Sequence, residues 1–426
     1  MARSRADCLG LDLRDPLAEQ RGAFALPDGV VYLDGNSLGA LPKATMPRLR
    51  QLVENEWGRG LIGSWNDAGW IDAPRRVGAK VARLIGAADD EVICADSTSV
   101  NLFKALAAAL RLQHAAAPEC DVILSELGNF PTDHYIAQGI TEMFGGRYNL
   151  LTVPGDEIAY HIDEGTAVLL LTHVNYRTGR MHDIEDLTHR AHLSGALTVW
   201  DLSHSAGAVP LDLARARADF AVGCGYKYLN GGPGAPAFVF AARRHLQAMH
   251  ADRFAQPVAG WFGHRAPFDF STEYEPAAGI DRFAAGTPSI IALAALECGV
   301  DSVLAAGVEP LRAKSLQLMQ LFIDLVEQRC AGLGLQLLSP RDPSQRGSQV
   351  CYAHDDAWPV MQALVARGVV GDYRAGDAGA PGILRFGFAP LYVRFVDVWD
   401  AVEILRDTLA ARSWDQPQFQ ARRVVT

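Results

Sequence analysis

The sequence predicts an α/β fold with a large domain built on a mainly parallel sheet and a smaller C-terminal α/β domain. Short apolar runs, each of the length of a buried strand, alternate with helix-like segments through most of the chain. The run 167–174 is apolar almost throughout, as expected of a central strand covered on both faces. The 426 residues also exceed the usual size of a single domain.

The chain is expected to divide into four segments. The change of domain is placed within a helix that the apolar pattern predicts over 290–306. No internal repeat or low-complexity tract interrupts the pattern. The segments are an N-terminal arm with its lead-in (1–45), a large domain (46–292), a small C-terminal domain (293–412) and a polar tail (413–426).

Composition and charge argue against several classes of protein. The chain has 49 acidic and 39 basic residues, a net charge of −10 and no basic run, which argues against nucleic-acid binding. No apolar stretch approaches the ~20 residues that span a bilayer, and the N-terminus lacks the apolar core of a signal peptide. The seven cysteines are scattered without a Cys-x-x-Cys pair, which favours a reducing compartment and argues against a metal site. We therefore predict a cytoplasmic protein without nucleic-acid, membrane or metal partners.

The strongest candidate for chemistry is a pair of predicted strands, each followed by a charged residue. The apolar run 196–200 ends in Asp201, and the run 220–225 ends just before Lys227 and a glycine-rich loop. Ligands bind at strand ends in open α/β sheets, so both side chains are placed where chemistry occurs. Their spacing, 227 − 201 = 26 residues, fits one strand–helix–strand crossover.

An aspartate and a lysine placed in this way suit pyridoxal phosphate. Lys227 would form a Schiff base with the aldehyde, which requires an amine that loses its proton easily in a partly desolvated site. Asp201 would keep the ring nitrogen protonated, so that the ring accepts electrons. The alternative is that both residues lie on a solvated surface, as single Asp and Lys residues usually do. His204 and the glycine run 230–234 favour the cofactor.

Further candidates follow other predicted strands. Ser97 and Thr98 begin a helix, where their hydroxyls either cap the helix or bind phosphate. Phe130 follows the strand 121–127 and either stacks on a planar ring, with Asp133 at the ring edge, or packs in a buried loop. Thr172 lies at the end of the central strand, again at the ligand-binding edge.

Two residues outside this edge are candidates for substrate binding. Trp65 lies in a glycine-rich segment and either lines a pocket or serves packing. Arg385 stands in a predicted strand among apolar neighbours, so it should meet a carboxylate. That carboxylate belongs either to a structural ion pair or to a substrate held in a two-pronged contact.

Seven motifs together resemble those of the kynureninases, fold-type I pyridoxal-phosphate enzymes related to the class V aminotransferases. The resemblance covers nearly the whole chain. Generic class V enzymes share the Asp-x-x-His motif and the lysine spacing but not this combination. The motifs are YLDGNSLG (32–39), FPTDHY (130–135), HVNYRTG (173–179), WDLSHSAGAVP (200–210), GCGYKYLNGGPG (223–234), GWFGH (260–264) and RFGFAPLY (385–392).

The resemblance implies roles for individual residues. Lys227 would be the Schiff-base lysine and Asp201 the partner of the pyridine nitrogen, with Tyr226 as a proton donor. Trp65 and Thr287 are as in the bacterial type, whereas vertebrate enzymes carry His and Asn there, which indicates a preference for kynurenine over its 3-hydroxy form. The other implied contacts are phosphate binding by Ser97, Thr98, Tyr226, Trp261 and Thr287, ring contacts by Phe130, Pro131, Thr132, Asp133, Thr172 and His204, and substrate binding by Arg385, Trp65 and Asn36.

The activity implied is hydrolytic cleavage of the Cβ–Cγ bond of L-kynurenine to anthranilate and L-alanine, a step of tryptophan catabolism in the kynurenine pathway, which also serves NAD biosynthesis. The same cleavage of 3-hydroxykynurenine is a second activity to consider, and the family is homodimeric. One rival is another pyridoxal-phosphate lyase such as a cysteine desulfurase, which needs a nucleophilic cysteine on a mobile loop. The other rival is a non-catalytic pyridoxal-phosphate regulator, which would add a DNA-binding module that this sequence does not show.

Overall fold

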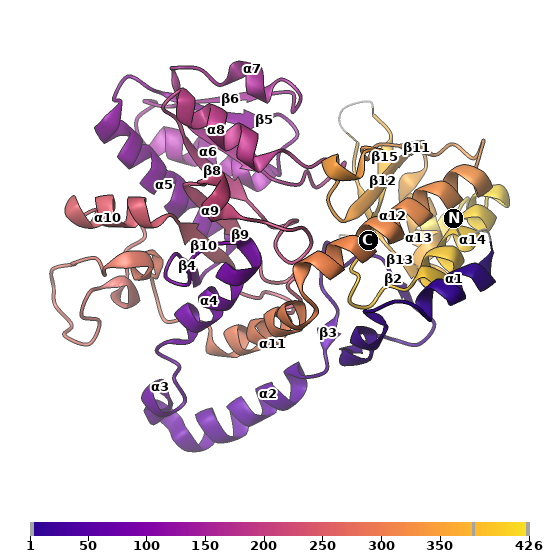
Figure 1. The fold of residues 1–426 in the computed structure, drawn as a ribbon, viewed down its shortest axis with the longest axis horizontal. Coiled ribbons are helices and arrows are strands. Elements are labelled where there is room, and N and C mark those ends of the chain that lie inside the picture. The colour runs from indigo at the N-terminus through magenta and orange to yellow at the C-terminus, as the bar shows by residue number, and fades with distance from the viewer. Residues whose placement is uncertain (1–3, 377–379, 423–426) are drawn as a thin grey trace.

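The computed structural model describes residues 4–376 and 380–422, and within them two sheets lie side by side (Figure 1). Neighbouring strands of the larger sheet pair in parallel from β9 to β6, while β10 pairs antiparallel with β9 and β4. This confirms the predicted α/β fold with a mainly parallel sheet. The strand order is β4 (Val92–Cys94), β10 (Phe238–Ala241), β9 (Phe220–Gly223), β8 (Leu197–Asp201), β7 (Thr166–Thr172), β5 (Val122–Glu126) and β6 (Asn149–Val153).

The larger sheet is buried on both faces because its strands are apolar on both faces. In β7, Leu169 and Leu171 enter a core shared with α4 and α8, while Val168 and Leu170 enter a second core shared with α5 and α6. The helices of this part are α4 (Ala73–Ile85), α5 (Thr98–Ala116), α6 (Pro131–Met143), α7 (Ile158–His161), α8 (Ile184–Leu193), α9 (Leu213–Ala216) and α10 (Arg243–Ala251).

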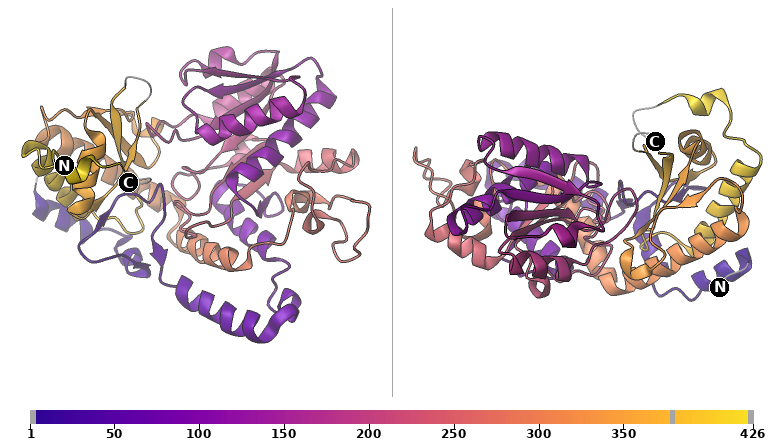
Figure 2. Two further views of the ribbon diagram at one scale, coloured as in Figure 1. Left: turned by 180° about the vertical axis from the view of Figure 1, so that it is seen from behind. Right: turned by 90° about the horizontal axis from the view of Figure 1, so that it is seen from above.

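The smaller sheet is antiparallel and lies in the C-terminal part of the chain, drawn orange to yellow beside the larger sheet (Figure 2). In it Arg385 of β15 pairs in register with Cys351 of β12 and with Asp372 of β14. The strand order is β11 (Gln336–Leu337), β12 (Gln349–His354), β15 (Gly382–Gly387) and β14 (Asp372–Arg374). The accompanying helices are α12 (Val308–Arg329), α13 (Ala357–Ala366), α14 (Phe395–Ala410) and α15 (Pro417–Gln420).

The N-terminal segment joins both parts. Helix α1 (Arg5–Asp12) packs on α14, and β2 (Val31–Tyr32) pairs in parallel with β13 (Val369–Val370). β1 (Phe24–Ala25) pairs with β3 (Leu41–Pro42), and the chain then runs out into an arm that stands away from the larger sheet (Figure 1). The arm consists of α2 (Thr45–Gln51), a π-helical segment (Leu52–Gly60) and α3 (Ser64–Asp67). Short 3₁₀ turns occupy Ala18–Ala23, Leu61–Gly63, Trp261–Gly263, Gly279–Phe283 and Pro343–Gln345.

A long helix, α11 (Ile290–Ala306), leads from the larger part to the smaller one and matches the helix predicted over 290–306. It packs on α2 and α4, and the chain bends by 81° at its junction with α12. Among the described residues no single helix is both long and apolar enough to cross a membrane; the bent pair α11–α12 reaches that length and composition only when taken together.

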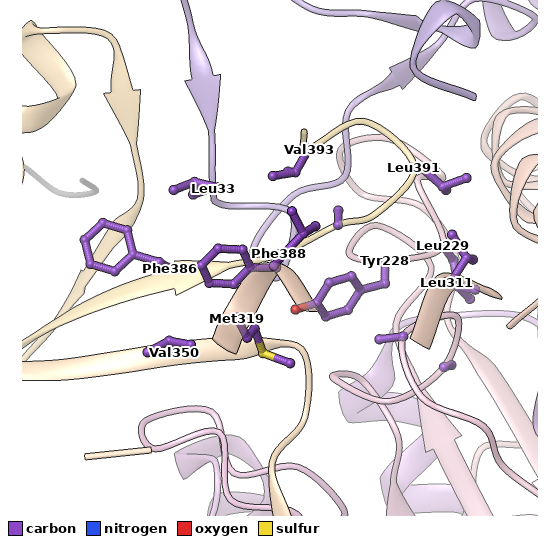
Figure 3. Close-up of a cluster of buried hydrophobic side chains, with 14 of the residues drawn as sticks. Leu33, Tyr228, Leu229, Leu311, Met319, Val350, Phe386, Phe388, Leu391 and Val393 are labelled. Atoms are coloured by element: carbon purple, nitrogen blue, oxygen red, sulfur yellow. The ribbon is translucent and has the colours of Figure 1, made fainter. Parts of the chain in front are cut away.

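The two parts share a hydrophobic cluster next to the loop that carries Lys227 (Figure 3). Tyr228 and Leu229 of that loop pack there with side chains from the segment after β2, from α12 and from the smaller sheet. Burial of such side chains contributes about 1.5–3 kcal/mol each, so the cluster holds the lysine loop against the smaller part. The other labelled members are Leu33, Leu311, Met319, Val350, Phe386, Phe388, Leu391 and Val393.

Candidate active site

Lys227 follows β9 on a tightly held loop at the carboxyl end of the parallel strands. Its Nζ lies 2.8 Å from Nε2 of His204 and 5.9 Å from the centroid of the Phe130 ring. The loop is fixed by its backbone, since the amide of Gly39 donates to the carbonyl of Tyr226 at 2.8 Å. The side chain of Lys227 is half-buried, so its amine is shielded from bulk water but can be reached by a ligand.

Two buried carboxyl groups face this one amine. Asp201 ends β8 and accepts from the amide of Ser203 at 2.7 Å, while Asp133 lies on α6 and accepts from the hydroxyl of Thr172 at 3.2 Å. Burial raises the pKa of Asp201, although Ser203 and Lys227 oppose the shift. Burial, followed by the charge of Asp201, raises the pKa of Asp133 well above its usual value. Two buried carboxyl groups with raised pKa values favour a positively charged partner, and a protonated ring nitrogen would be such a partner.

His204, three residues after Asp201, is a neutral imidazole. Its Nδ1 lies 3.0 Å from Oε1 of Gln349, and its Nε2 faces Lys227. Burial, with the charge of Lys227 next, lowers the pKa of His204 well below its usual value. His204 is therefore an uncharged hydrogen-bonding partner of the amine.

Phe130 presents a ring for stacking. It occupies the N-cap position of α6, and Pro131 and Thr132 form the first helical turn behind it. The side chain remains 39% exposed even though one edge packs against Tyr176 at a centroid separation of 5.2 Å. A planar ligand that covers this face would gain an aromatic contact.

The hydroxyls predicted to bind phosphate line a cavity of about 440 Å³. Ser97 caps α5, a helix of 19 residues, by accepting from the amide of Val100 at 3.4 Å. The neighbouring Asp96 is paired with the buried Lys104 at 2.7 Å, so its charge is offset. The free amides and dipole of a helix N-terminus favour an anion, so this cavity fits a phosphate group. Site residues on its wall are Ser97, Thr98, Tyr226 and Thr287.

Trp261, Thr287 and Trp65 form a connected group beside this cavity. Nε1 of Trp261 donates to the hydroxyl of Thr287 at 3.3 Å. Trp65 packs edge-on against Trp261 at 6.2 Å, and also against Trp70 and Phe262. The structure thus brings these three predicted residues together, and the ring contacts of Trp65 are with other aromatic side chains.

Arg385 lies in a polar cluster of its own. Its Nε donates to Asp372 at 2.7 Å and its Nη2 contacts the other oxygen of the same carboxylate. Nη2 also donates to the hydroxyl of Ser37 at 2.8 Å, and Nη1 to the carbonyl of Tyr176 at 2.8 Å. The expected carboxylate partner is therefore present within the protein. The two-pronged face of the guanidinium is occupied by Asp372, and Nη1 already donates one of its two N–H groups to the carbonyl of Tyr176 in a side chain that is 1% exposed.

Asn36 is fully buried beside this cluster. Its Nδ2 approaches Oε1 of Gln349 at 3.5 Å, and its Oδ1 lies against Gly387, where an added Cβ would come within 1.9 Å. Among the described residues, Asn36 Oδ1 has no hydrogen-bond partner.

Several residues of the site were not predicted from the sequence. Gln349, Ser37 and Asp372 are held against predicted site residues by hydrogen bonds. No local pattern marks Gln349 or Asp372, whereas Ser37 lies within the motif at 32–39 but was given no role. Asn129 is different, because its position in the loop before Phe130 was a usable signal; it contacts the hydroxyl of Thr172.

Comparison with solved structures defines the fold. A cysteine desulfurase from Thermococcus onnurineus NA1 is similar with a TM-score of 0.76 at 21% identity, covering 92% of this chain and 98% of that one. A cysteine desulfurase from Escherichia coli gives a TM-score of 0.74 at 20% identity, covering 93% and 98%. A cystine C-S lyase variant, described with glycine covalently linked to its pyridoxal-phosphate cofactor, gives 0.74 at 17% identity, covering 92% and 98%. The chain has the fold-type I architecture of these enzymes.

Comparison of sequences defines the family. A protein named kynureninase from Burkholderia mallei (strain SAVP1) is 54% identical over 426 residues, covering 100% of both chains. A kynureninase from Pseudomonas fluorescens is 52% identical over 424 residues, covering 99% of this chain and 100% of that one. The family model for the kynureninase C-terminal domain matches residues 311–405. This chain belongs to the kynureninase family, as its motifs predicted.

Proposed function

We propose that the site around Lys227 hydrolyses the Cβ–Cγ bond of L-kynurenine, giving anthranilate and L-alanine, with pyridoxal phosphate as the cofactor. The observation that carries the proposal is the juxtaposition of one amine, two buried carboxyl groups and an exposed aromatic face, in a chain 54% identical to kynureninases over its full length. The family places the reaction in tryptophan catabolism by the kynurenine pathway.

The residues present fit the cofactor. Lys227 would bind the aldehyde covalently, Asp201 would pair with the ring nitrogen, and Phe130 would cover one ring face. Ser97 and Thr98 would hold the phosphate at the N-terminus of α5. When bound, pyridoxal phosphate withdraws electrons from the substrate's α-carbon and so weakens the bonds next to it.

The chain's own groups move the protons. The amine of Lys227 would take the α-proton of the substrate, and neutral His204 would accept a hydrogen bond from this amine, whose Nζ lies 2.8 Å from Nε2 of the imidazole. Water adds to the Cγ ketone, and the hydrate breaks between Cβ and Cγ, releasing anthranilate. Tyr226 would then give a proton to Cβ and Lys227 would return one to the α-carbon, which together complete alanine. Burial raises the pKa of Tyr226, so the phenol keeps its proton until that step.

Substrate recognition is assigned to two places. Arg385 holds the substrate carboxylate from its Nη1 side, next to buried Asn36. The aryl ring meets Trp65, whose ring contacts are with other aromatic side chains, and the nearby hydroxyl of Thr287 is already bonded by Nε1 of Trp261. A hydroxyl buried without a partner is disfavoured, so kynurenine is the preferred substrate and 3-hydroxykynurenine the poorer one.

The protein is proposed to be a cytoplasmic homodimer. All seven cysteines lie among the described residues and are free thiols, as is usual in a reducing compartment. The arm exposes Trp57, Leu61 and Ile62, with exposed fractions of 55, 62 and 80%. Contiguous exposed apolar side chains of this size mark an interaction surface. Because the kynureninase family is homodimeric, the proposed partner on this surface is a second copy of the chain.

Cysteine desulfuration is a poorer candidate because the thiols are shielded. Six of the seven cysteines are buried and Cys298 is partly so. Burial raises the pKa of Cys330 to about 11 and that of Cys351 to about 12. A thiol that stays protonated at neutral pH is a weak nucleophile.

Anthranilate fluorescence tests the proposal directly. Purified protein loaded with pyridoxal phosphate is given L-kynurenine, 3-hydroxykynurenine or cysteine in parallel. We expect anthranilate and alanine from kynurenine, and slower turnover of the hydroxylated analogue. A yellow, cofactor-loaded protein that makes no anthranilate would contradict the reaction while leaving the fold intact.

Replacement of Lys227 tests its role directly. Lys227→Ala removes the amine that binds the cofactor and moves the α-proton, so turnover should fall by at least about 10³-fold. The stable yellow absorbance of the loaded protein should also be lost. Near-normal turnover in this variant would refute the assignment of Lys227.

A further inference from the structure

The side chain of Gln349 makes several hydrogen bonds at the site. It is the first residue of β12 and is completely buried. Its Nε2 donates to the backbone carbonyls of Asn175 at 3.1 Å and Tyr176 at 3.0 Å. Its Oε1 faces Nδ1 of His204 at 3.0 Å and Nδ2 of Asn36 at 3.5 Å.

These contacts decide the orientation of the Gln349 amide. The two carbonyls can only accept, so the NH₂ group must lie on their side and the oxygen on the side of His204. An oxygen there can only accept, so Nδ1 of the neutral imidazole carries the hydrogen. Nε2 of His204 is then left with its lone pair, and it is this atom that lies 2.8 Å from Nζ of Lys227.

Gln349 is also rigidly placed. The carbonyl of the preceding residue, Ser348, accepts from the hydroxyl of Tyr228 at 2.9 Å, which ties β12 to the residue after Lys227. The following residue, Val350, packs in the hydrophobic cluster shared with the lysine loop (Figure 3). The amide therefore cannot turn without disturbing two carbonyl bonds and this packing.

We propose that Gln349 is a positioning residue that holds His204 as the Nδ1–H tautomer, so that Nε2 accepts a hydrogen bond from the amine of Lys227. The smaller sheet thus sets the hydrogen-bonding state of a histidine that follows β8 of the larger one. The inference deepens the proposed function and rests on it for the role of Lys227. Partners that fix a histidine tautomer commonly change activity when removed.

Gln349→Met tests the proposal, because it keeps the side-chain length and removes both the acceptor and the donors. Full-length protein labelled with ¹⁵N-histidine is measured by NMR before and after loading with pyridoxal phosphate, and the His204 signals are assigned from a His204→Asn sample. In the wild type we expect the His204 signals to show that Nδ1 is protonated and that Nε2 is not. In the Gln349→Met variant we expect the signals no longer to show this single tautomer. kcat for kynurenine should fall about 10- to 100-fold with KM nearly unchanged, since Gln349 is not placed against the substrate.

Gln349→Glu gives a readout that a purely structural role would not move. A carboxylate beside Nδ1 favours the charged imidazolium, so His204 should take up its second proton at a higher pH than in the wild type. Gln113→Met is the matched control, because Gln113 is also buried and its amide donates to a backbone carbonyl, that of Gly195. That variant should leave the His204 signals and kcat unchanged.

Two results would overturn the proposal. One is an unchanged His204 tautomer with near-normal kcat in Gln349→Met. The other is an equal loss of kcat in Gln113→Met, which would indicate general destabilisation. If the wild type itself fails to cleave kynurenine, the proposed function is wrong, but the tautomer measurement still decides the role of Gln349.

Discussion

At the scale of single residues, Arg385 lies in a buried cluster of opposite charges. Arg385 and Arg374 share the carboxylate of Asp372, and Arg374 contacts it at 2.8 Å. Asp34 lies close by with a buried Oδ1 that has no hydrogen-bond partner among the described residues. Burial, with the charge of Asp372 next, raises the pKa of Asp34 to about 7.

Asp34→Asn should therefore stabilise the protein above neutral pH. The folded-state pKa of Asp34 is raised above its ordinary value of 3.8, so the favourable contribution of this group exists at low pH and is lost as the pH rises through about 7. At pH 8 we expect the variant to unfold with a free energy on the order of 2 kcal/mol higher than the wild type. The difference should shrink as the pH falls towards 4.

Denaturant unfolding at pH 5, 7 and 8 measures this effect. Asp28→Asn replaces an exposed aspartate of the same segment and serves as the control. Identical pH dependence in the wild type and Asp34→Asn would contradict the prediction.

At the scale of elements, the segment before β3 is pressed against the lysine loop. A Cβ added to Gly39 would come within 2.3 Å of the carbonyl oxygen of Lys227 and 2.7 Å of Cα of Asn230. Both are backbone atoms, so the loop itself would have to move. The position needs glycine because of this close approach.

Gly39→Ala should displace Lys227 and weaken cofactor binding. Overpacking of this kind costs about 1–3 kcal/mol, which corresponds to roughly a 5- to 150-fold higher Kd for pyridoxal phosphate if the strain is relieved by moving the loop. Absorbance titration of cofactor-free protein measures the Kd. Gly22→Ala, where no heavy atom lies within 4 Å of the added Cβ, should bind normally. Equal affinity of the two variants would show that the loop tolerates the contact.

A second element-scale feature lies at the opposite end of the sheet from the site. Asp219, just before β9, is buried and accepts from His192, His245, Arg244 and the amide of Thr198 at 2.7–2.9 Å. Despite burial, the hydrogen bonds from His192 and His245 hold the pKa of Asp219 well below its usual value. This carboxylate joins α8, β8 and α10 at one point.

Asp219→Asn should destabilise the fold without changing the chemistry. The depressed pKa means that the stabilisation is present above pH ~4 and is lost as the pH falls through the lower folded-state pKa. We expect a loss of about 3 kcal/mol at pH 7, because Arg244 and the hydrogen-bond donors around Asp219 lose their charged partner. Thermal or urea unfolding gives this value, with the exposed Asp89→Asn as control. A kcat that falls in protein shown to be folded would contradict a purely structural role.

At the scale of the whole molecule, the exposed apolar arm predicts assembly. We expect the wild type to sediment as a species of twice the chain mass of 46.0 kDa. The double variant Trp57→Glu, Ile62→Glu should place negative charge in the interface and shift the protein from dimer towards monomer. Analytical ultracentrifugation measures this shift. Leu193→Glu alters an exposed leucine outside the arm and should have no effect. A monomeric wild type would refute the dimer.

The sequence by itself determined the fold class, the family and the residues that stand at strand ends. Asp201, Lys227, Thr172 and Ser97 could be placed because strand period and helix capping are local, and parallel strands bring their carboxyl ends to one edge. The same local signals located the helix over 290–306. The proposed division of domains near residue 292 and the separate tail remain predictions, and residues 1–3 and 423–426 of the end segments lie outside the described residues.

Only the tertiary structure decided how distant residues meet. It showed that the carboxylate partner of Arg385 is Asp372, on the neighbouring strand, and that Gln349 of the smaller sheet bonds His204 of the larger one. It also showed that Gly39 lies against the lysine loop. Arg385 and Asp372 are 13 positions apart in the sequence, whereas Gly39 and Asn230 are 191 positions apart. Their partners are set by the packing of two sheets around a shared core, which no local pattern of residues encodes.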